Sequence, residues 1–241
     1  MNVVHVDDTT PKRTPRAARR EVVTDTLLER AMELVEADGI EGLTLQRVAQ
    51  SLGYVTTAVY RYFPSKDALV AALQRRAIGV VREHFERELL RRVGPLGDAA
   101  APTRALAALL AAADIYLDLP RAEPRAWFLV AVLLGDPRPL LSDEESARTR
   151  PGVVEFLSGV GLLFEAAVRE RALDPGSKEE RVLTFWAALH GALCLEKARR
   201  IAPELPPSRA IGLAAVRGLL AGWGATPARV GAAVRVLEKG K

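Results

Sequence analysis

Apolar residues recur at helical spacing along this chain, and beyond residue 65 no segment alternates apolar and polar residues as a half-buried strand does. Proline and glycine clusters separate the helical runs, because both residues interrupt regular backbone structure. The only long separator is the polar stretch 136–152, which we expect to be a mobile or functional loop. The pattern predicts helices near 66–93, 103–118, 122–135, 152–172, 178–201, 208–223 and 227–238. The predicted fold class is therefore all-α.

Between residues 44 and 63 two short helical patterns flank Gly53. Thr44 supplies an N-cap oxygen to the first pattern, and its apolar residues follow at i, i+3, i+4 and i+7: Leu45, Val48, Ala49 and Leu52. The second pattern can pack back on the first through Ala58, Val59, Tyr62 and Phe63. Its other side then carries Thr56, Thr57, Tyr60 and Arg61, whose hydroxyl and guanidinium groups suit the major groove of DNA. An ordinary helical hairpin with a polar surface is the alternative.

The neighbouring segments complete a three-helix unit. Upstream, Leu27, Ala31 and Val35 share one face of a longer helix that ends at Gly39, a C-cap residue. Downstream, Pro64 stops the second short helix and Ser65 can cap a new helix beginning at Lys66. The free N–H groups of this helix and the Lys66 ammonium could together hold one phosphate of a DNA backbone.

Residues 24–73 resemble the N-terminal domain of the TetR (tetracycline repressor) family of transcriptional regulators. The similarity lies in five elements in order, among them Leu43-Thr44-Leu45, Val59-Tyr60-Arg61-Tyr62-Phe63 and the run from Ser65 to Leu69. By position, the resemblance implies DNA contacts from Thr44, Thr56, Thr57, Ala58, Tyr60, Tyr62 and Lys66. Thr57 and Ala58 stand where family members vary most and would set sequence preference. The resemblance also implies a C-terminal helical domain that binds an effector and dimerises.

We accordingly divide the chain into a disordered basic tail over 1–19, a helix-turn-helix DNA-binding domain over 20–66, and a helical ligand-binding and dimerisation domain over 67–241. A net charge of +4 permits an anionic partner. Positive charge is concentrated in the tail, at Lys12, Arg13, Arg16, Arg19 and Arg20. The tail either reaches along the DNA or serves only solubility.

Cysteine usage and hydropathy indicate a cytoplasmic protein. Cys194 is the only cysteine, so the chain forms no internal disulfide and no cysteine-based zinc site. Its first twenty residues contain no apolar core of a signal peptide. The apolar stretches 105–117 and 126–135 are too short to span a bilayer, so we expect no membrane partner.

Large side chains spread over the C-terminal helices are the candidate ligand contacts. They are Phe85, Tyr116, Trp127, Phe128, Phe156, Phe164, Trp186 and His190. Such residues form either a packed core or the wall of an apolar cavity. A cavity of this composition predicts a hydrophobic or aromatic effector.

Small residues at helical spacing mark segments 178–201 and 208–223, where two backbones can approach closely. The family dimerises through its last long helices, so the resemblance implies a homodimer interface there. The helix predicted over 227–238 is additional to the minimal family pattern and could cap this interface or pack at its edge.

Enzyme motifs are missing from the sequence: we find no GxSxG, Walker-type loop, HExxH or Cys–His cluster, and His5, His84 and His190 lack metal-ligand spacing. We therefore expect no cofactor and no metal. The favoured function is a homodimeric repressor that binds a palindromic operator and is released by a small hydrophobic effector. The alternatives are an enzyme, or an effector-free architectural protein with a solid C-terminal domain, that carries a helix-turn-helix.

Overall fold

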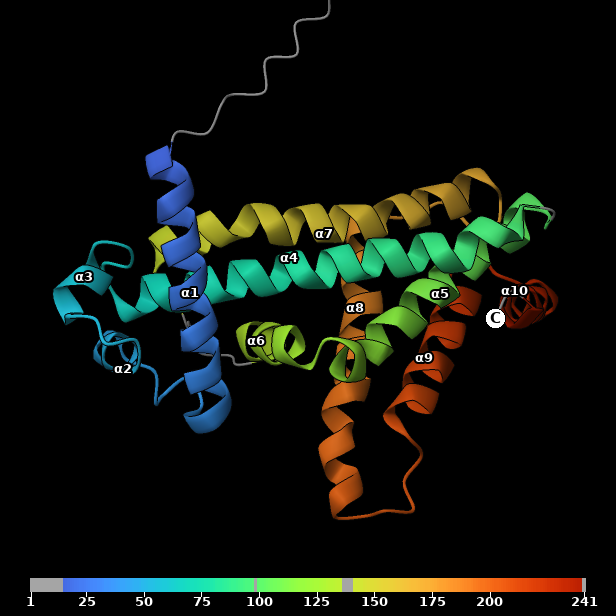
Figure 1. The fold of residues 1–241 in the computed structure, drawn as a ribbon. Coiled ribbons are helices and arrows are strands. Elements are labelled where there is room, and N and C mark those ends of the chain that lie inside the picture. Colours follow the sequence, from blue (N-terminus) through green and yellow to red (C-terminus); the bar gives the residue numbers. More distant parts are fainter. Residues whose placement is uncertain (1–14, 98, 136–140, 240–241) are drawn as a thin grey trace, which may run out of the picture. The chain divides into compact units, whose positions relative to one another are not determined.

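The computed structural model describes residues 15–97, 99–135 and 141–239, apart from the side chains of residues 133 and 134. The chain divides into two compact units, one ending at Leu73 and the other beginning at Gln74. The described residues form helices and connecting turns without a strand, which confirms the predicted all-α fold (Figure 1). The first unit contains α1 (Pro15–Asp38), α2 (Leu45–Ser51), α3 (Thr56–Tyr60) and the first turns of α4 (Lys66–Val93).

The first unit is built around one face of α1. Leu27, Leu28, Ala31, Met32 and Val35 of this face are buried. Of the apolar residues predicted for α2, Leu45, Val48 and Ala49 are buried, and Leu52 is half-buried at the C-cap. Helix α1 begins at Pro15, because proline lacks the N–H that would be unpaired at a helix start. Residues 15–19 of the expected disordered tail are therefore helical, and residues 1–14 of it lie outside the described residues.

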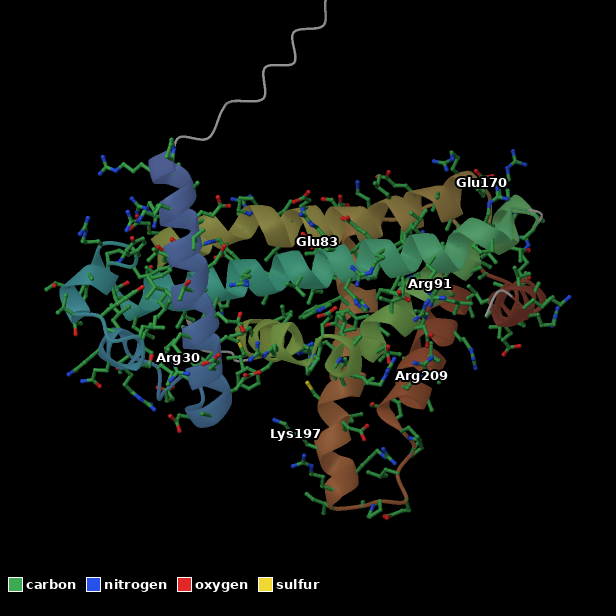
Figure 2. The ribbon with its side chains drawn as sticks, viewed as in Figure 1. Arg30, Glu83, Arg91, Glu170, Lys197 and Arg209 are labelled. Atoms are coloured by element: carbon green, nitrogen blue, oxygen red, sulfur yellow. The ribbon has the colours of Figure 1, made fainter. Side chains whose placement is uncertain are left out.

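The second unit is centred on α5 (Ala101–Ala122), in which every residue from Ala105 to Leu117 is buried. A helix that is apolar on all sides needs neighbours on all sides. The remaining elements are η1 (Gly94–Leu96), α6 (Pro124–Gly135), α7 (Asp143–Arg169), α8 (Lys178–Cys194), η2 (Leu195–Arg200), α9 (Ser208–Gly222) and α10 (Pro227–Lys239). Helix α7 packs on α5 and α8, α9 on α5 and α8, and α10 on α5. Charged side chains such as Glu83 and Lys197 lie on the exposed faces (Figure 2).

Gly212 explains how α9 comes so close to α5. A Cβ atom at this position would lie 2.8 Å from Leu117 Cδ2 and 3.3 Å from Ala192 Cβ of α8. Both separations are shorter than ordinary carbon–carbon contacts. This glycine therefore serves packing within the chain.

Two helices differ from their predicted bounds because they continue through a proline. Helix α7 begins at Asp143, capped by Ser142, and includes Pro151, so residues 143–152 are helical where the sequence predicted loop. Glu145 anchors this early part because its buried carboxylate pairs with Arg75 at 2.9 Å and Arg148 at 2.6 Å. Helix α5 likewise passes Pro120 and ends at Ala122. Tertiary contacts can outweigh the roughly 3 kcal/mol that an interior proline costs.

Helix α7 is long and apolar enough, by length and composition alone, to cross a membrane, with a mean hydropathy of 1.5 over 18 residues. One such helix is weak evidence for a span. Only 22% of this stretch is buried, and Val154 and Leu162 are exposed. This face of α7 is therefore open to a further contact.

Candidate DNA interface and candidate ligand cavity

The turn between α2 and α3 is fixed by a side-chain cap and one glycine. Thr44 has an extended backbone, and its hydroxyl oxygen accepts a hydrogen bond from the Arg47 N–H at 3.1 Å. Gly53 has φ +68°, a left-handed conformation that other residues adopt only with strain. The Tyr54 N–H then bonds to the Ala49 carbonyl at 2.9 Å. Together they position α3 across the end of α2 as the sequence predicted.

The outer side of α3 carries most of the residues predicted to contact DNA. Thr57 is exposed and Tyr60 is 52% exposed, whereas Val59 and Phe63 are buried beneath them. Thr44 is exposed, and the remaining predicted contacts are half-buried: Thr56, Ala58, Tyr62 and Lys66. The structure therefore groups the seven residues in one unit, around α3 and the helix starts on either side of it. Their contact with DNA stays a prediction.

Tyr62 and Lys66 are each held by a neighbouring segment. The Arg20 guanidinium of α1 lies 5.7 Å from the centre of the Tyr62 ring, within cation–π range. Lys66 Nζ donates to the Glu41 carbonyl at 3.2 Å, and the Ser65 hydroxyl oxygen accepts from the Ala68 N–H at 3.0 Å. A lysine ammonium has three N–H donors, so this bond leaves capacity for a phosphate.

Two exposed residues beside α3 were missed by the sequence analysis. Tyr54 is 42% exposed and Val55, the N-cap residue of α3, is 70% exposed. They stand on the same exposed turn as the start of α3. Their exposure could have been predicted from the sequence. Apolar side chains that follow a turn glycine and match no helical face are not expected to pack in the core of the unit.

The second unit contains an apolar cavity of about 140 Å³ walled by helices α4 to α8. Among its lining residues only Tyr116 and Trp186 carry polar side-chain atoms. The lining residues are Ile78, Val81, Tyr116, Val130, Val153, Phe156, Leu157, Leu183 and Trp186. A site of this composition favours an uncharged, largely apolar molecule, because a charge placed in it would lose its hydration without gaining a partner.

A buried hydrogen-bond chain satisfies the polar groups around this cavity. Trp186 Nε1 donates to the Tyr116 hydroxyl oxygen at 2.9 Å, and the Tyr116 hydroxyl lies 3.1 Å from His190 Nδ1. Burial lowers the pKa of His190 and raises the pKa of Tyr116, so both groups are neutral near pH 7. With Trp186 donating to its oxygen, Tyr116 is free to donate its one proton to Nδ1, which places the imidazole proton on Nε2.

The eight predicted ligand contacts occupy different environments. Tyr116, Phe156 and Trp186 line the cavity. Phe85 packs on Phe156 at 5.2 Å between ring centres, and Trp127 packs on Tyr116 at 5.5 Å. His190 stacks on Trp186 at 5.1 Å. These six residues therefore form or directly support the cavity.

The other two predicted contacts lie elsewhere. Phe128 is 41% exposed, and Phe164 is fully buried against the rings of Phe185 and Trp223. Neither lines the cavity. Most of the cavity wall consists instead of aliphatic residues that the sequence analysis missed. Nothing in a sequence separates an aliphatic side chain that faces a cavity from one in a filled core.

Residues 27–73 match the model of "bacterial regulatory proteins, tetR family". The matched segment contains the buried face of α1, all of α2 and α3 and the start of α4. Residues 27–73 therefore carry a DNA-binding domain of the TetR family. This match favours a DNA-binding regulator over the enzyme alternative.

Two relatives differ in how much of this chain they cover. The HTH-type transcriptional repressor DrrR1 of Streptomyces coeruleorubidus is 38% identical over 61 residues, 25% of this chain and 23% of that protein. The chain thus matches less than a quarter of that repressor. The nucleoid occlusion factor SlmA of Haemophilus influenzae is 29% identical over 175 residues, 71% of each protein.

Among solved structures, the complex of RolR with resorcinol has the same fold. Its TM-score is 0.59 at 13% identity, covering 93% of this chain and 97% of that one. The likeness extends over both units and therefore includes the C-terminal helices that the family model does not match. At this identity it shows the fold alone.

Proposed function

We propose that this protein is a homodimeric transcriptional repressor that is released from a palindromic operator by a small, uncharged, largely apolar effector. The observation that carries the proposal is the apolar cavity in the second unit of a chain whose first unit is a complete helix-turn-helix. An effector-free DNA-binding protein would have no use for such a cavity.

The cavity volume limits the size of the effector. A dry apolar cavity of about 150 Å³ accommodates one benzene molecule, and this cavity measures about 140 Å³. The fitting ligand is therefore a compact molecule of about one ring. Its polar groups would have to meet the Tyr116 hydroxyl, which already bonds to Trp186 and His190. RolR, which has this fold, binds the neutral one-ring molecule resorcinol, in accord with this size class.

Helix α4 offers a physical link between effector and DNA. Its first residue is Lys66, a predicted phosphate contact, and Ile78 and Val81 further along it line the cavity. An effector that displaced the cavity end of α4 would tilt the helix and change the separation of the two DNA-binding heads of a dimer. A coupling of about 1–3 kcal/mol would lower operator affinity roughly 5- to 150-fold.

Dimerisation is assigned to the exposed face of α8 and its extension through η2. Leu183 and Leu195 are each about half exposed, and the smaller residues Ala187, Gly191 and Cys194 between them are exposed. This stripe remains after α8 has packed on α7 and α9. An apolar stripe of this length favours a second helix, and a two-fold axis would place the same stripe of a second copy on it.

The 29% identity to a nucleoid occlusion factor favours a second candidate, an architectural DNA-binding protein. One experiment separates the two functions. The full-length protein is used to select operators from a random DNA pool, and a panel of neutral one-ring compounds is then screened by thermal shift and operator release. Compounds that stabilise the protein and release the operator support the proposal. Operator binding that no stabilising compound alters would favour the architectural role.

Lys66→Ala is expected to weaken binding to every DNA sequence alike, because a phosphate contact carries no sequence information. Loss of one phosphate contact should also lower the slope of log affinity against log salt by about 1. Fluorescence anisotropy at several KCl concentrations measures both effects. Lys239→Ala, which removes an exposed lysine from the end of α10, is the matched control and should leave the slope unchanged. An unchanged slope for Lys66→Ala would remove this residue from the predicted contacts.

A further inference from the structure

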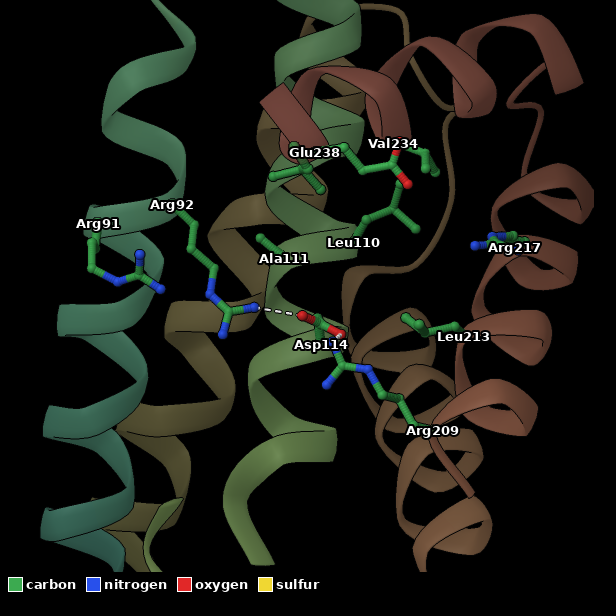
Figure 3. Close-up of a pocket in the computed structure, with 11 residues that line it drawn as sticks. Arg91, Arg92, Leu110, Ala111, Asp114, Arg209, Leu213, Arg217, Val234 and Glu238 are labelled. Atoms are coloured by element: carbon green, nitrogen blue, oxygen red, sulfur yellow. Dashed lines mark hydrogen bonds and ion pairs between the residues drawn. The ribbon is translucent and has the colours of Figure 1, made fainter. Parts of the chain in front are cut away.

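A second cavity lies on the opposite side of α5 from the apolar one. It also measures about 140 Å³, and α4, α5, α9 and α10 wall it (Figure 3). Asp114 lines this cavity and Tyr116 lines the first, and residues two apart on a helix point about 200° apart. The two cavities share no lining residue. The second cavity is therefore a separate candidate site.

Its charged wall contains four arginines and two carboxylates: Arg91, Arg92, Arg209, Arg217, Asp114 and Glu238. Buried Asp114 accepts a hydrogen bond from Arg92 Nη1 at 2.6 Å through Oδ2, and its Oδ1 pairs with Arg209. Figure 3 shows the Arg92 and Arg209 side chains converging on Asp114 from α4 and α9. The carboxylate thereby holds two guanidinium groups at the base of the cavity.

The arginines of this wall are not all paired. The lining carries four positive and two negative charges, and two carboxylates outside it oppose them: Glu88, which pairs with Arg91 at 2.9 Å, and Asp118, which interacts electrostatically with Arg209 and Arg92. Arg92 Nε is buried, and its nearest carboxylate oxygen, on Glu88, is 3.6 Å away, beyond hydrogen-bond range. Neither Arg217 nor Glu238 forms an ion pair with a described residue. Arg217 thus presents an unneutralised guanidinium at the cavity.

The rest of the wall is aliphatic: Leu110, Ala111, Leu213, Val234 and Leu237. Arginines beside an aliphatic surface complement a molecule that has one anionic group and a short hydrocarbon part. Helix α10, which is additional to the minimal pattern of the family, supplies Val234, Leu237 and Glu238. The site therefore depends on α10 as well as on α4, α5 and α9.

We propose that this arginine-lined cavity binds a small organic carboxylate with a short hydrocarbon tail, as a second ligand site distinct from the apolar cavity. The carboxylate pairs with Arg217 and with the N–H groups that Asp114 leaves free on Arg92 and Arg209. The tail covers the aliphatic wall. The site is independent of the proposed repressor function, since it needs neither DNA nor the neutral effector.

Isothermal titration of the full-length protein with hexanoate at low salt tests the proposal. Saturable binding of hexanoate is expected. Two control ligands should each bind at least about tenfold more weakly: hexanamide, which has the same tail without the charge, and inorganic phosphate, which has charge without a tail. Arg217→Gln should weaken hexanoate binding about tenfold, the effect of one charge-assisted hydrogen bond. Its melting temperature should be unchanged because Arg217 is exposed.

Two variants locate the binding. Arg150→Gln removes the same charge from an exposed position on α7 and should leave hexanoate affinity unchanged, and so should Trp186→Ala in the apolar cavity. The proposal would be overturned if the native chain and Arg217→Gln bound hexanoate with equal affinity. It would also be overturned if hexanamide bound as tightly as hexanoate, or if Trp186→Ala lost hexanoate binding. Normal hexanoate binding by an Arg217→Gln protein that dissociates more readily would show that the arginines serve an interface between copies.

Discussion

Trp186→Ala is expected to leave a folded dimer that binds operator but responds to a neutral one-ring effector only at concentrations at least about tenfold higher, whereas Phe164→Ala should destabilise the whole unit. Both residues were predicted as ligand contacts, and the structure separates them. Phe164 is 1% exposed and enclosed by other rings, so its truncation should cost about 3–5 kcal/mol. Trp186 is half-buried at a cavity wall, where truncation removes fewer contacts.

Thermal melting and operator-release titrations with resorcinol as the probe measure the two effects. Trp186→Phe is the conservative companion, because it keeps most of the ring volume but removes the N–H that bonds to Tyr116. If Trp186→Ala melts as early as Phe164→Ala and sediments as a monomer, Trp186 belongs to the core and the cavity assignment is wrong. A folded Trp186→Ala protein with unchanged effector response would likewise remove Trp186 from the ligand site.

Gly191→Glu should convert the dimer to a folded monomer and reduce operator affinity by about 100-fold or more, because two linked heads bind far more tightly than one. A side chain at this exposed position on α8 would meet no other atom within 4 Å of its Cβ, so the monomer has room for it. Replacing an interior helical glycine should even stabilise the isolated helix by roughly 0.5–1 kcal/mol. A lost dimer could therefore not be explained by a damaged fold.

Gly159→Glu on α7 is the matched control, since Gly159 is also exposed and its Cβ would also meet no atom within 4 Å. Sedimentation velocity of the two variants should show dissociation for Gly191→Glu alone. Dissociation of the α7 variant alone would move the interface to the exposed face that carries Val154 and Leu162. Two intact dimers would exclude both faces.

Short-range signals in the sequence determined the DNA-binding unit and the helical class. The Thr44 cap, the left-handed Gly53 and the Ser65 cap act within a few residues of chain, and all three occur in the structure as predicted. The helical spacing of Val59 and Phe63 likewise identified the buried side of α3 and hence its exposed side. Such features depend on neighbouring residues only, so a sequence displays them directly.

Only the tertiary structure decided which C-terminal side chains line a cavity and which are packed in the core. Phe156 and Phe164 stand eight residues apart on α7, yet one lines the apolar cavity and the other is enclosed by Phe185 and Trp223. In the sequence, Asp114 only interrupts an apolar run. Its pairing with Arg92 and Arg209, which lie on other helices, is seen only in the structure. Helix α7 passes Pro151 because Glu145 is anchored by Arg75, a partner seventy positions earlier in the chain. In each case the deciding contact joins residues far apart along the chain, so a pattern of neighbouring residues could not reveal it.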